Sequence, residues 1–246
     1  MLAIPLMLLV GWFFLVERME WGSVPFSRAD FSALGADTGA SGKLENLDDA
    51  TPPVAKEIDT TAHRILFFGD SMVEGLKGMM AQHAAANGHE LTSIIWYSST
   101  TDWWANTDTL QHFIQEVRPT YILICLGANE LFVRDLLAVD KNIANIVRQI
   151  GKTPFAWISP PNWKEDTGIN ELIIKNVGAD RYFDSRHLEL ARRSDHAHPT
   201  PAAAVQWCNK VCAWLSTLQP RHPIRMQKPV DKVKRSSRVV VLQPMS

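Results

Sequence analysis

The feature that most constrains the fold is a regular alternation of short apolar runs and helix-like segments between residues 63 and 219. The expected strands are residues 64–68, 91–97, 121–126, 155–159 and 181–184, and the expected helices are residues 74–87, 107–117, 139–150, 169–177 and 202–218. This alternation favours an α/β domain with a parallel sheet and helices on both of its faces. In such sheets ligands bind beyond the carboxyl ends of the strands. Functional residues are therefore expected directly after each strand.

The first 34 residues are expected to direct the chain to or across a membrane. Residues 2–16 carry no charged side chain. They are shorter than the roughly 20 residues that span a bilayer, and they match the upper limit of about 15 for the apolar region of a signal peptide. We predict an exported protein in the periplasm or cell envelope that keeps residues 1–34 as an anchor. A cleaved signal or a buried helix of the folded domain remains an alternative.

The segments on either side of the α/β region differ from it in composition. Residues 35–62 are rich in Gly, Ala, Thr, Asp and Pro, which is typical of a flexible linker. Residues 220–246 are basic and are expected to form a flexible, solvated tail. The run 237–243 near its end could add an edge strand, but we do not predict one. The folded domain is therefore expected to span residues 63–219.

Composition argues against several classes of protein. The 25 Lys and Arg residues are balanced by 26 Asp and Glu residues, so the basic surplus of a nucleic-acid-binding protein is missing. Three cysteines are too few for a disulfide scaffold. Cys125, Cys208 and Cys212 are expected to pack in the core. No His and Cys residues have the spacing of a structural zinc site.

Candidate catalytic residues follow the first expected strand. Gly69-Asp70-Ser71-Met72 lies at a strand-to-helix turn, where a serine hydroxyl reaches the top of the sheet. The backbone N–H of Ser71 would lie at a helix N-terminus, which stabilises developing negative charge. The alternative is that Ser71 only caps the helix.

Two later loops could complete such a site. Asn129, in Gly127-Ala128-Asn129-Glu130, could donate its side-chain amide to an oxyanion, or it could simply cap a turn. The loop from Asp195 to Thr200 supplies a histidine base, which a serine nucleophile needs, and an acid that orients it. His196 and His198 are rival bases, and a polar surface loop is the alternative without function.

These three motifs, in this order, resemble those of the SGNH/GDSL hydrolase family over residues 63–219. The resemblance implies a three-layer α/β/α fold with a flavodoxin-like, five-stranded parallel sheet. It also implies ester hydrolysis through an acyl-serine, without a metal or an organic cofactor. Residue by residue, Ser71 matches the nucleophile and Asn129 the side-chain oxyanion donor. His198, which lies before Pro-Thr, matches the base, and Asp195 matches the acid.

One part of the family pattern is altered. Where the family has a glycine whose backbone N–H is an oxyanion donor, the best match is Thr101, with Ser98 and Ser99 as alternatives. A β-branched residue does not easily adopt a positive φ angle, so the loop is expected to differ in shape. Four tryptophans near the expected strand ends could form an aromatic rim for a sugar or could pack in the core: Trp103, Trp104, Trp157 and Trp163.

The sequence thus predicts a membrane-tethered, extracytoplasmic serine esterase. The expected substrate is a small acyl ester, with acetyl on an envelope or secreted carbohydrate favoured. An acyltransferase using the same acyl-serine and a non-catalytic glycan-binding module are the alternatives. No nucleic-acid partner is expected, and the sequence does not predict an oligomeric state.

Overall fold

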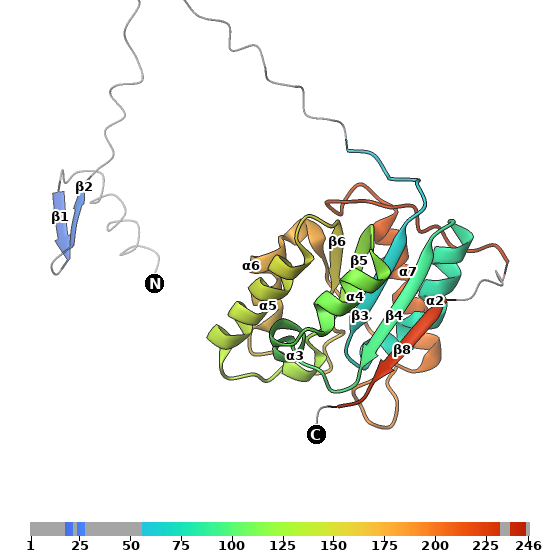
Figure 1. The fold of residues 1–246 in the computed structure, drawn as a ribbon. Coiled ribbons are helices and arrows are strands. Elements are labelled where there is room, and N and C mark those ends of the chain that lie inside the picture. The colour runs from blue at the N-terminus through green and yellow to red at the C-terminus, as the bar shows by residue number, and fades with distance from the viewer. Residues whose placement is uncertain (1–17, 22–23, 28–55, 232–236, 245–246) are drawn as a thin grey trace, which may run out of the picture. The chain divides into compact units, whose positions relative to one another are not determined.

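The computed structural model describes residues 18–21, 24–27, 56–231 and 237–244 (Figure 1). The chain divides into two compact units, residues 1–53 and residues 54–246. In the first unit, β1 (Arg18–Trp21) and β2 (Val24–Ser27) form an antiparallel hairpin. The expected anchor spans residues 1–34, and its uncharged run, residues 2–16, lies outside the described residues. Within the described part of the chain, no helix is both long enough and apolar enough to span a bilayer.

The second unit contains a six-stranded sheet in which all the neighbouring strands are parallel. The strands lie in the order β7-β6-β5-β3-β4-β8. Their bounds are β3 Arg64–Gly69, β4 Glu90–Trp96, β5 Tyr121–Cys125, β6 Phe155–Ile158, β7 Tyr182–Phe183 and β8 Arg238–Leu242. The prediction of an α/β fold with a parallel sheet is confirmed.

Helices cover both faces of this sheet (Figure 1). One face packs against α2 (Met72–Ala86) and α7 (Pro201–Leu215), and the other packs against α3 (Thr101–Asn106), α4 (Thr109–Val117), α5 (Leu136–Ile150) and α6 (Ile169–Val177). A hydrophobic core lies on each face of the sheet, and alternate residues of β3 pack in the two cores. Ile65 and Phe67 face α2 and α7, whereas Leu66 and Phe68 face the other helices. Burial on both faces explains why the central strands are continuous apolar runs.

The sheet has six strands where five were expected. β8 lies in the segment expected to be a flexible tail, and it pairs with β4 from Thr92↔Arg238 to Trp96↔Leu242. Its β-branched residues suit a strand, and its backbone satisfies the N–H and C=O groups that would otherwise line the edge of β4. The indole of Trp96 also donates a hydrogen bond to the carbonyl of Gln243, at 2.9 Å.

The segment just after α7 also belongs to the folded unit. Ile224 and Met226 are buried in the core that α2 and α7 share. The end of the expected linker pairs with this segment, because the N–H of Asp59 donates to Pro223 O and the N–H of Arg225 donates to Asp59 O, each at 2.9 Å. The described part of the folded unit therefore extends beyond residues 63–219 at both ends.

Candidate active site

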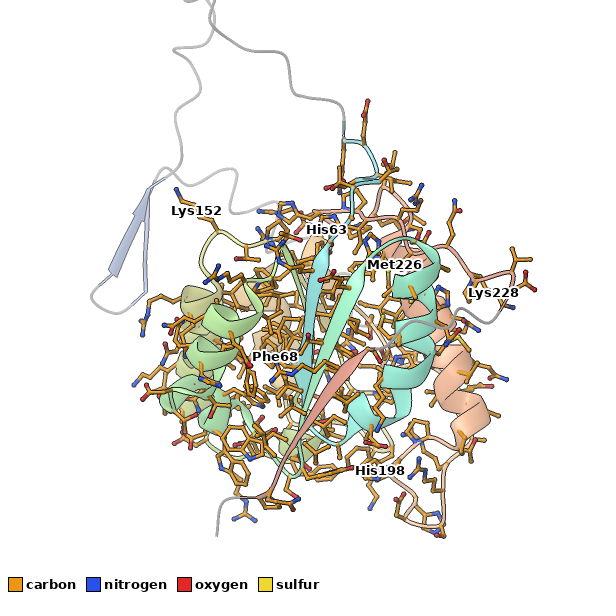
Figure 2. All side chains as sticks on the ribbon, turned by 45° about the vertical axis from the view of Figure 1, so that its right-hand side comes forward. His63, Phe68, Lys152, His198, Met226 and Lys228 are labelled. Carbon is orange, nitrogen blue, oxygen red and sulfur yellow. The ribbon has the colours of Figure 1, made fainter. Side chains whose placement is uncertain are left out.

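The candidate site lies at the carboxyl ends of β3 and β5, the two strands at the middle of the sheet order. From β3 the chain passes to β4 on one side, and from β5 it passes to β6 on the other side. The loops that leave these two strands diverge, which opens a crevice above the sheet. Figure 2 shows His198 at this end of the sheet and His63 at the opposite end.

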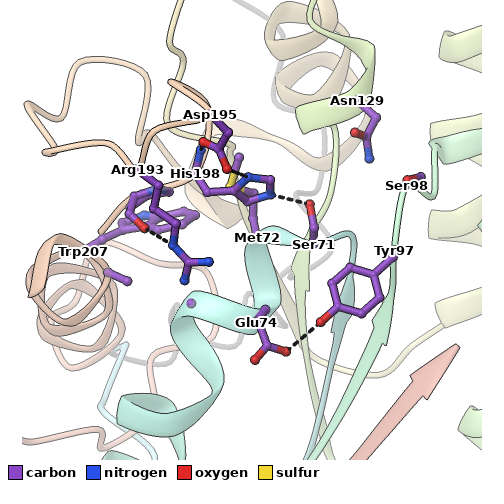
Figure 3. Close-up of a pocket in the computed structure, with 13 residues that line it drawn as sticks. Ser71, Met72, Glu74, Tyr97, Ser98, Asn129, Arg193, Asp195, His198 and Trp207 are labelled. Atoms are coloured by element: carbon purple, nitrogen blue, oxygen red, sulfur yellow. Dashed lines mark hydrogen bonds and ion pairs between the residues drawn. The ribbon is translucent and has the colours of Figure 1, made fainter. Parts of the chain in front are cut away.

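A chain of hydrogen bonds joins the three residues expected to be catalytic (Figure 3). Ser71 Oγ lies 2.8 Å from His198 Nε2. On the other side of the imidazole ring, His198 Nδ1 lies 2.9 Å from Asp195 Oδ2. Ser71 comes directly before α2, and Asp195 and His198 lie in the loop before α7. In this geometry the imidazole can take the hydroxyl proton of a serine while the carboxylate holds the ring.

The Asp195 carboxylate is fixed by its own loop. Its Oδ1 accepts hydrogen bonds from the backbone N–H groups of His198 and Ala197, each at 2.9 Å. These two bonds, together with the one to the His198 ring, lower the pKa of Asp195 to about 2. The carboxylate is therefore ionised at neutral pH and can stabilise a protonated imidazole.

The structure distinguishes the two candidate bases. His196 is exposed and adopts a left-handed backbone conformation with φ of 58°, and its N–H donates to Arg193 O at 3.0 Å. Of the two histidines, only His198 lines the pocket that contains Ser71.

Asp70 joins the two turns that carry Ser71 and Asn129, a role that the motif alone did not suggest. Its carboxylate is fully buried, and it accepts hydrogen bonds from Met72 N at 2.9 Å and from Ala128 N at 3.1 Å. Burial raises the pKa of Asp70 to about 7, although these two hydrogen bonds oppose the shift. The only signal in the sequence was its position between Gly69 and the serine.

Asn129 and Ser98 bring hydrogen-bond donors to the same pocket. The side-chain amide of Asn129 donates one N–H to Ser99 O at 2.9 Å, which orients the amide and leaves its second N–H available. Ser98 has a left-handed φ of 59°. Within the described part of the chain, no hydrogen bond engages the backbone N–H of Ser98 or of Ser71.

Thr101 is not brought to this pocket. Its backbone N–H donates to Glu130 Oε2 at 2.8 Å, and its hydroxyl donates to Glu130 Oε1 at 2.6 Å. Thr101 is buried at the start of α3. Because a buried carboxylate already accepts its N–H, Thr101 is not available as an oxyanion donor in this structure.

The pocket above Ser71 has a volume of about 370 Å³ and includes three side chains that the sequence did not suggest, those of Glu74, Tyr97 and Arg193 (Figure 3). Glu74 accepts hydrogen bonds from Lys77 Nζ at 2.6 Å and from the Tyr97 hydroxyl at 3.2 Å. The bond from Lys77 holds the pKa of Glu74 below its usual value. These residues give one wall of the pocket a polar, charged character.

Of the two alternatives for the four tryptophans, packing in the core describes most of them better than an aromatic rim. Trp104 and Trp157 are fully buried in the core, and Trp103 packs against Trp96 with ring centroids 5.2 Å apart. Trp163 is only partly buried. The three cysteines are buried with free thiols, in agreement with the expectation of core packing.

Comparison with known proteins adds no assignment. No protein-family model matches the chain, and no curated protein matches it in sequence.

Proposed function

We propose that this chain is a serine esterase of the SGNH/GDSL hydrolase type that acts through an acyl-Ser71 intermediate. The observation that carries the proposal is the unbroken hydrogen-bond chain from Ser71 through His198 to Asp195, on a pocket at the carboxyl ends of the central strands. The strand order supports it, because without β8 the remaining five strands follow the flavodoxin-like order 2-1-3-4-5.

In the first half of the reaction, His198 Nε2 takes the proton of the Ser71 hydroxyl as Oγ attacks the ester carbonyl carbon. The carbonyl π-electrons move to its oxygen, which becomes an oxyanion. When the carbonyl re-forms, the bond to the alcohol oxygen breaks, and His198 gives that oxygen its proton. Ser71 then carries the acyl group.

In the second half, His198 takes a proton from a water molecule that attacks the acyl carbon. The tetrahedral intermediate collapses, the carboxylic acid leaves, and the proton returns to Ser71 Oγ. Asp195 stays ionised throughout and stabilises the imidazolium each time that it forms.

The donors that we propose for the oxyanion come from three residues that line the pocket: the backbone N–H of Ser71, the backbone N–H of Ser98 and the second amide N–H of Asn129. Preorganised donors of this kind are often the largest contribution to catalysis of acyl transfer. We infer that Ser98, with its φ of 59°, replaces the donor expected at Thr101. Glycine adopts a left-handed backbone conformation more easily than other residues do, so the glycine of the family pattern would fit the conformation that Ser98 has here.

For the substrate we propose a small acyl ester, with acetyl on an envelope or secreted carbohydrate favoured. The volume of about 370 Å³ supports a small acyl group together with part of an alcohol. The uncharged run at residues 2–16 supports a membrane tether and an extracytoplasmic location.

The acyl-enzyme can be tested directly. The protein is mixed with p-nitrophenyl acetate, quenched in acid within the first turnover and digested, and its peptides are analysed by mass spectrometry. We expect an acetyl group on the peptide that contains Ser71, and none on that peptide from the Ser71→Ala variant. Turnover with the acetyl group on another residue, or with no acetylated peptide at any quench time, would contradict the proposal.

A further inference from the structure

A second hollow, of about 600 Å³, shares the lining residue Asn129 with the catalytic pocket. Phe132 and Trp163 both line it, and their rings meet edge to face with centroids 6.5 Å apart. Phe132 is 52% exposed, although it lies only three residues after the proposed oxyanion donor Asn129. A hollow lined by a pair of aromatic rings and a few polar groups is a candidate binding surface. We call this space the Phe132–Trp163 hollow.

Hydrogen bonds hold the segment that carries Phe132. Thr167 donates its backbone N–H to Leu131 O at 2.8 Å and its hydroxyl to Val133 O at 2.7 Å. These two carbonyl groups flank Phe132, so its backbone is tied to the loop that also contains Trp163. The two rings are therefore held together by their backbones as well as by their own contact.

Arg192 ties the Trp163 loop to the catalytic loop. One guanidinium nitrogen donates to the carbonyls of Pro161 and Asn162, at 3.0 and 3.1 Å, just before Trp163. Another donates to Ala197 O at 2.6 Å, directly before His198 in the chain. The aromatic pair is thus fixed relative to the catalytic base and to Asn129, and rigid positioning of this kind lowers the entropy cost of binding a ligand.

The charge of the hollow restricts what it can bind. Its acidic lining residues are the exposed Asp102 and Asp135 and the buried Glu130, and no Lys or Arg of the described part of the chain lines it. Burial raises the pKa of Glu130, and both of its oxygens already accept hydrogen bonds from Thr101, so Asp102 and Asp135 carry the negative charge of the hollow. An anionic ligand would be repelled there, whereas carboxylate and amide oxygens accept hydrogen bonds from hydroxyl groups. Aromatic faces with a few polar groups around them suit a ligand with one apolar face and several hydroxyls. A sugar ring without an acidic group has this chemistry.

We propose that the Phe132–Trp163 hollow binds a neutral sugar ring of the ester substrate, so that the enzyme selects acylated neutral glycans over acylated acidic ones. This inference rests on the proposed function, since the sugar would lie beside the oxyanion donor Asn129 while its ester reaches Ser71. It also narrows that function, because it excludes uronic acids and phosphorylated sugars at this position.

The test compares three substrates and two variants of the full chain. The substrates are methyl β-glucoside and methyl β-glucuronide, each acetylated at the same hydroxyl, and p-nitrophenyl acetate, which has no sugar. The variants are Phe132→Ala and, as a matched control, Leu137→Ala, which truncates a nearby side chain that is 64% exposed but does not line the hollow. We expect Phe132→Ala to raise KM for the glucoside about five- to tenfold at unchanged kcat, because an aromatic contact contributes to binding both substrate and transition state.

Three further comparisons complete the test. p-Nitrophenyl acetate hydrolysis should be unchanged in both variants, the glucoside should be unaffected by Leu137→Ala, and the wild type should prefer the glucoside to the glucuronide. Equal activity on the two acetylated sugars would overturn the inference, and so would the same KM for the glucoside in Phe132→Ala and Leu137→Ala. Either result would leave the proposed function intact as long as hydrolysis of p-nitrophenyl acetate still depends on Ser71.

Calorimetric binding gives a readout that does not depend on turnover. In the Ser71→Ala background the acetylated glucoside should bind, and adding Phe132→Ala should weaken its Kd by the same factor as the KM. If the glucoside binds in this way but the wild type shows no esterase activity, the proposed function fails and the sugar site stands. Equal Kd values with and without Phe132, or no detectable binding, would overturn the sugar site itself.

Discussion

His196 and His198 lie two positions apart in one loop, yet only the imidazole of His198 contacts Ser71, at 2.8 Å. We predict that His198→Ala lowers kcat/KM for p-nitrophenyl acetate roughly 10²–10⁴-fold, the usual effect of losing a general base. His196→Ala should keep near wild-type activity, because its side chain does not line the pocket. Circular dichroism of both variants checks that they are folded. Equal losses in two folded variants would remove the reason for assigning the base to His198.

Asp70 is expected to make stability depend on pH. Burial raises its pKa to about 7 in the folded protein, whereas an unfolded aspartate has a pKa of about 3.9. Between about pH 4 and about pH 7 the folded state therefore holds a proton that the unfolded chain has released. The stability that Asp70 contributes is fully present below this window, and it falls as the pH rises through the window.

The variant Asp70→Asn isolates this effect, because an amide does not titrate. Urea unfolding of wild type and variant at about pH 4 and about pH 8 gives the difference in their free energies of unfolding. We expect wild type to lose stability relative to the variant as the pH rises. A difference that stays constant with pH would show that Asp70 does not ionise in this range.

At the scale of elements, the close packing of β3 against β5 depends on Gly69. It pairs with Cys125, and a Cβ atom at this position would collide with the Cys125 carbonyl oxygen. Gly69→Ala should therefore destabilise the protein by roughly 3 kcal/mol, the upper part of the range for overpacked sites. The matched control is Gly78→Ala in α2, where a Cβ meets nothing within 4 Å.

The control should behave in the opposite way. Alanine is favoured over glycine within a helix by roughly 0.5–1 kcal/mol, so Gly78→Ala should raise Tm slightly. Thermal unfolding followed by circular dichroism measures both variants. A Gly69→Ala protein as stable as wild type would mean that the two strands can separate at their carboxyl ends without cost.

The elements differ in how well sequence predicts them, and the reason is burial. β3 and β5 are buried on both faces, so each belongs to an apolar run, and a glycine closes each run, Gly69 at the end of β3 and Gly127 after β5. β8 is a partly exposed edge strand that follows a run of basic residues, and this composition made it resemble part of a tail. Its pairing depends on the free edge of β4, whose residues lie 146 positions earlier in the chain than their partners, and local patterns do not contain this information.

The same distinction applies to the site. Ser71, Asn129, Asp195 and His198 follow from short motifs because the topology of a parallel sheet brings its strand ends together. The difference between Ser98 and Thr101 depends on the φ angle of a turn and on a buried carboxylate at Glu130. The Phe132–Trp163 hollow depends on contacts between two loops. Neither is encoded by residue spacing alone.

For the whole molecule, the proposed anchor is expected to be separable from catalysis. All the residues of the candidate site lie in the unit of residues 54–246. We predict that deletion of residues 1–34 yields a soluble, folded protein with the same kcat/KM for p-nitrophenyl acetate as the full chain in detergent. Gel filtration and circular dichroism test the folding. Aggregation of the truncated chain while the full chain is stable would indicate that residues 2–16 pack in the core.

The central claim, an acyl-serine mechanism at Ser71, is tested most directly by the steady-state rate of p-nitrophenyl acetate hydrolysis by purified Ser71→Ala protein. The substitution removes only the hydroxyl that His198 would activate, so folding should be unchanged. The account predicts a rate close to the uncatalysed background, and it predicts that adding His198→Ala lowers the rate no further, because the base then has nothing to activate. Full activity of the Ser71→Ala protein would contradict the mechanism and the proposed function together.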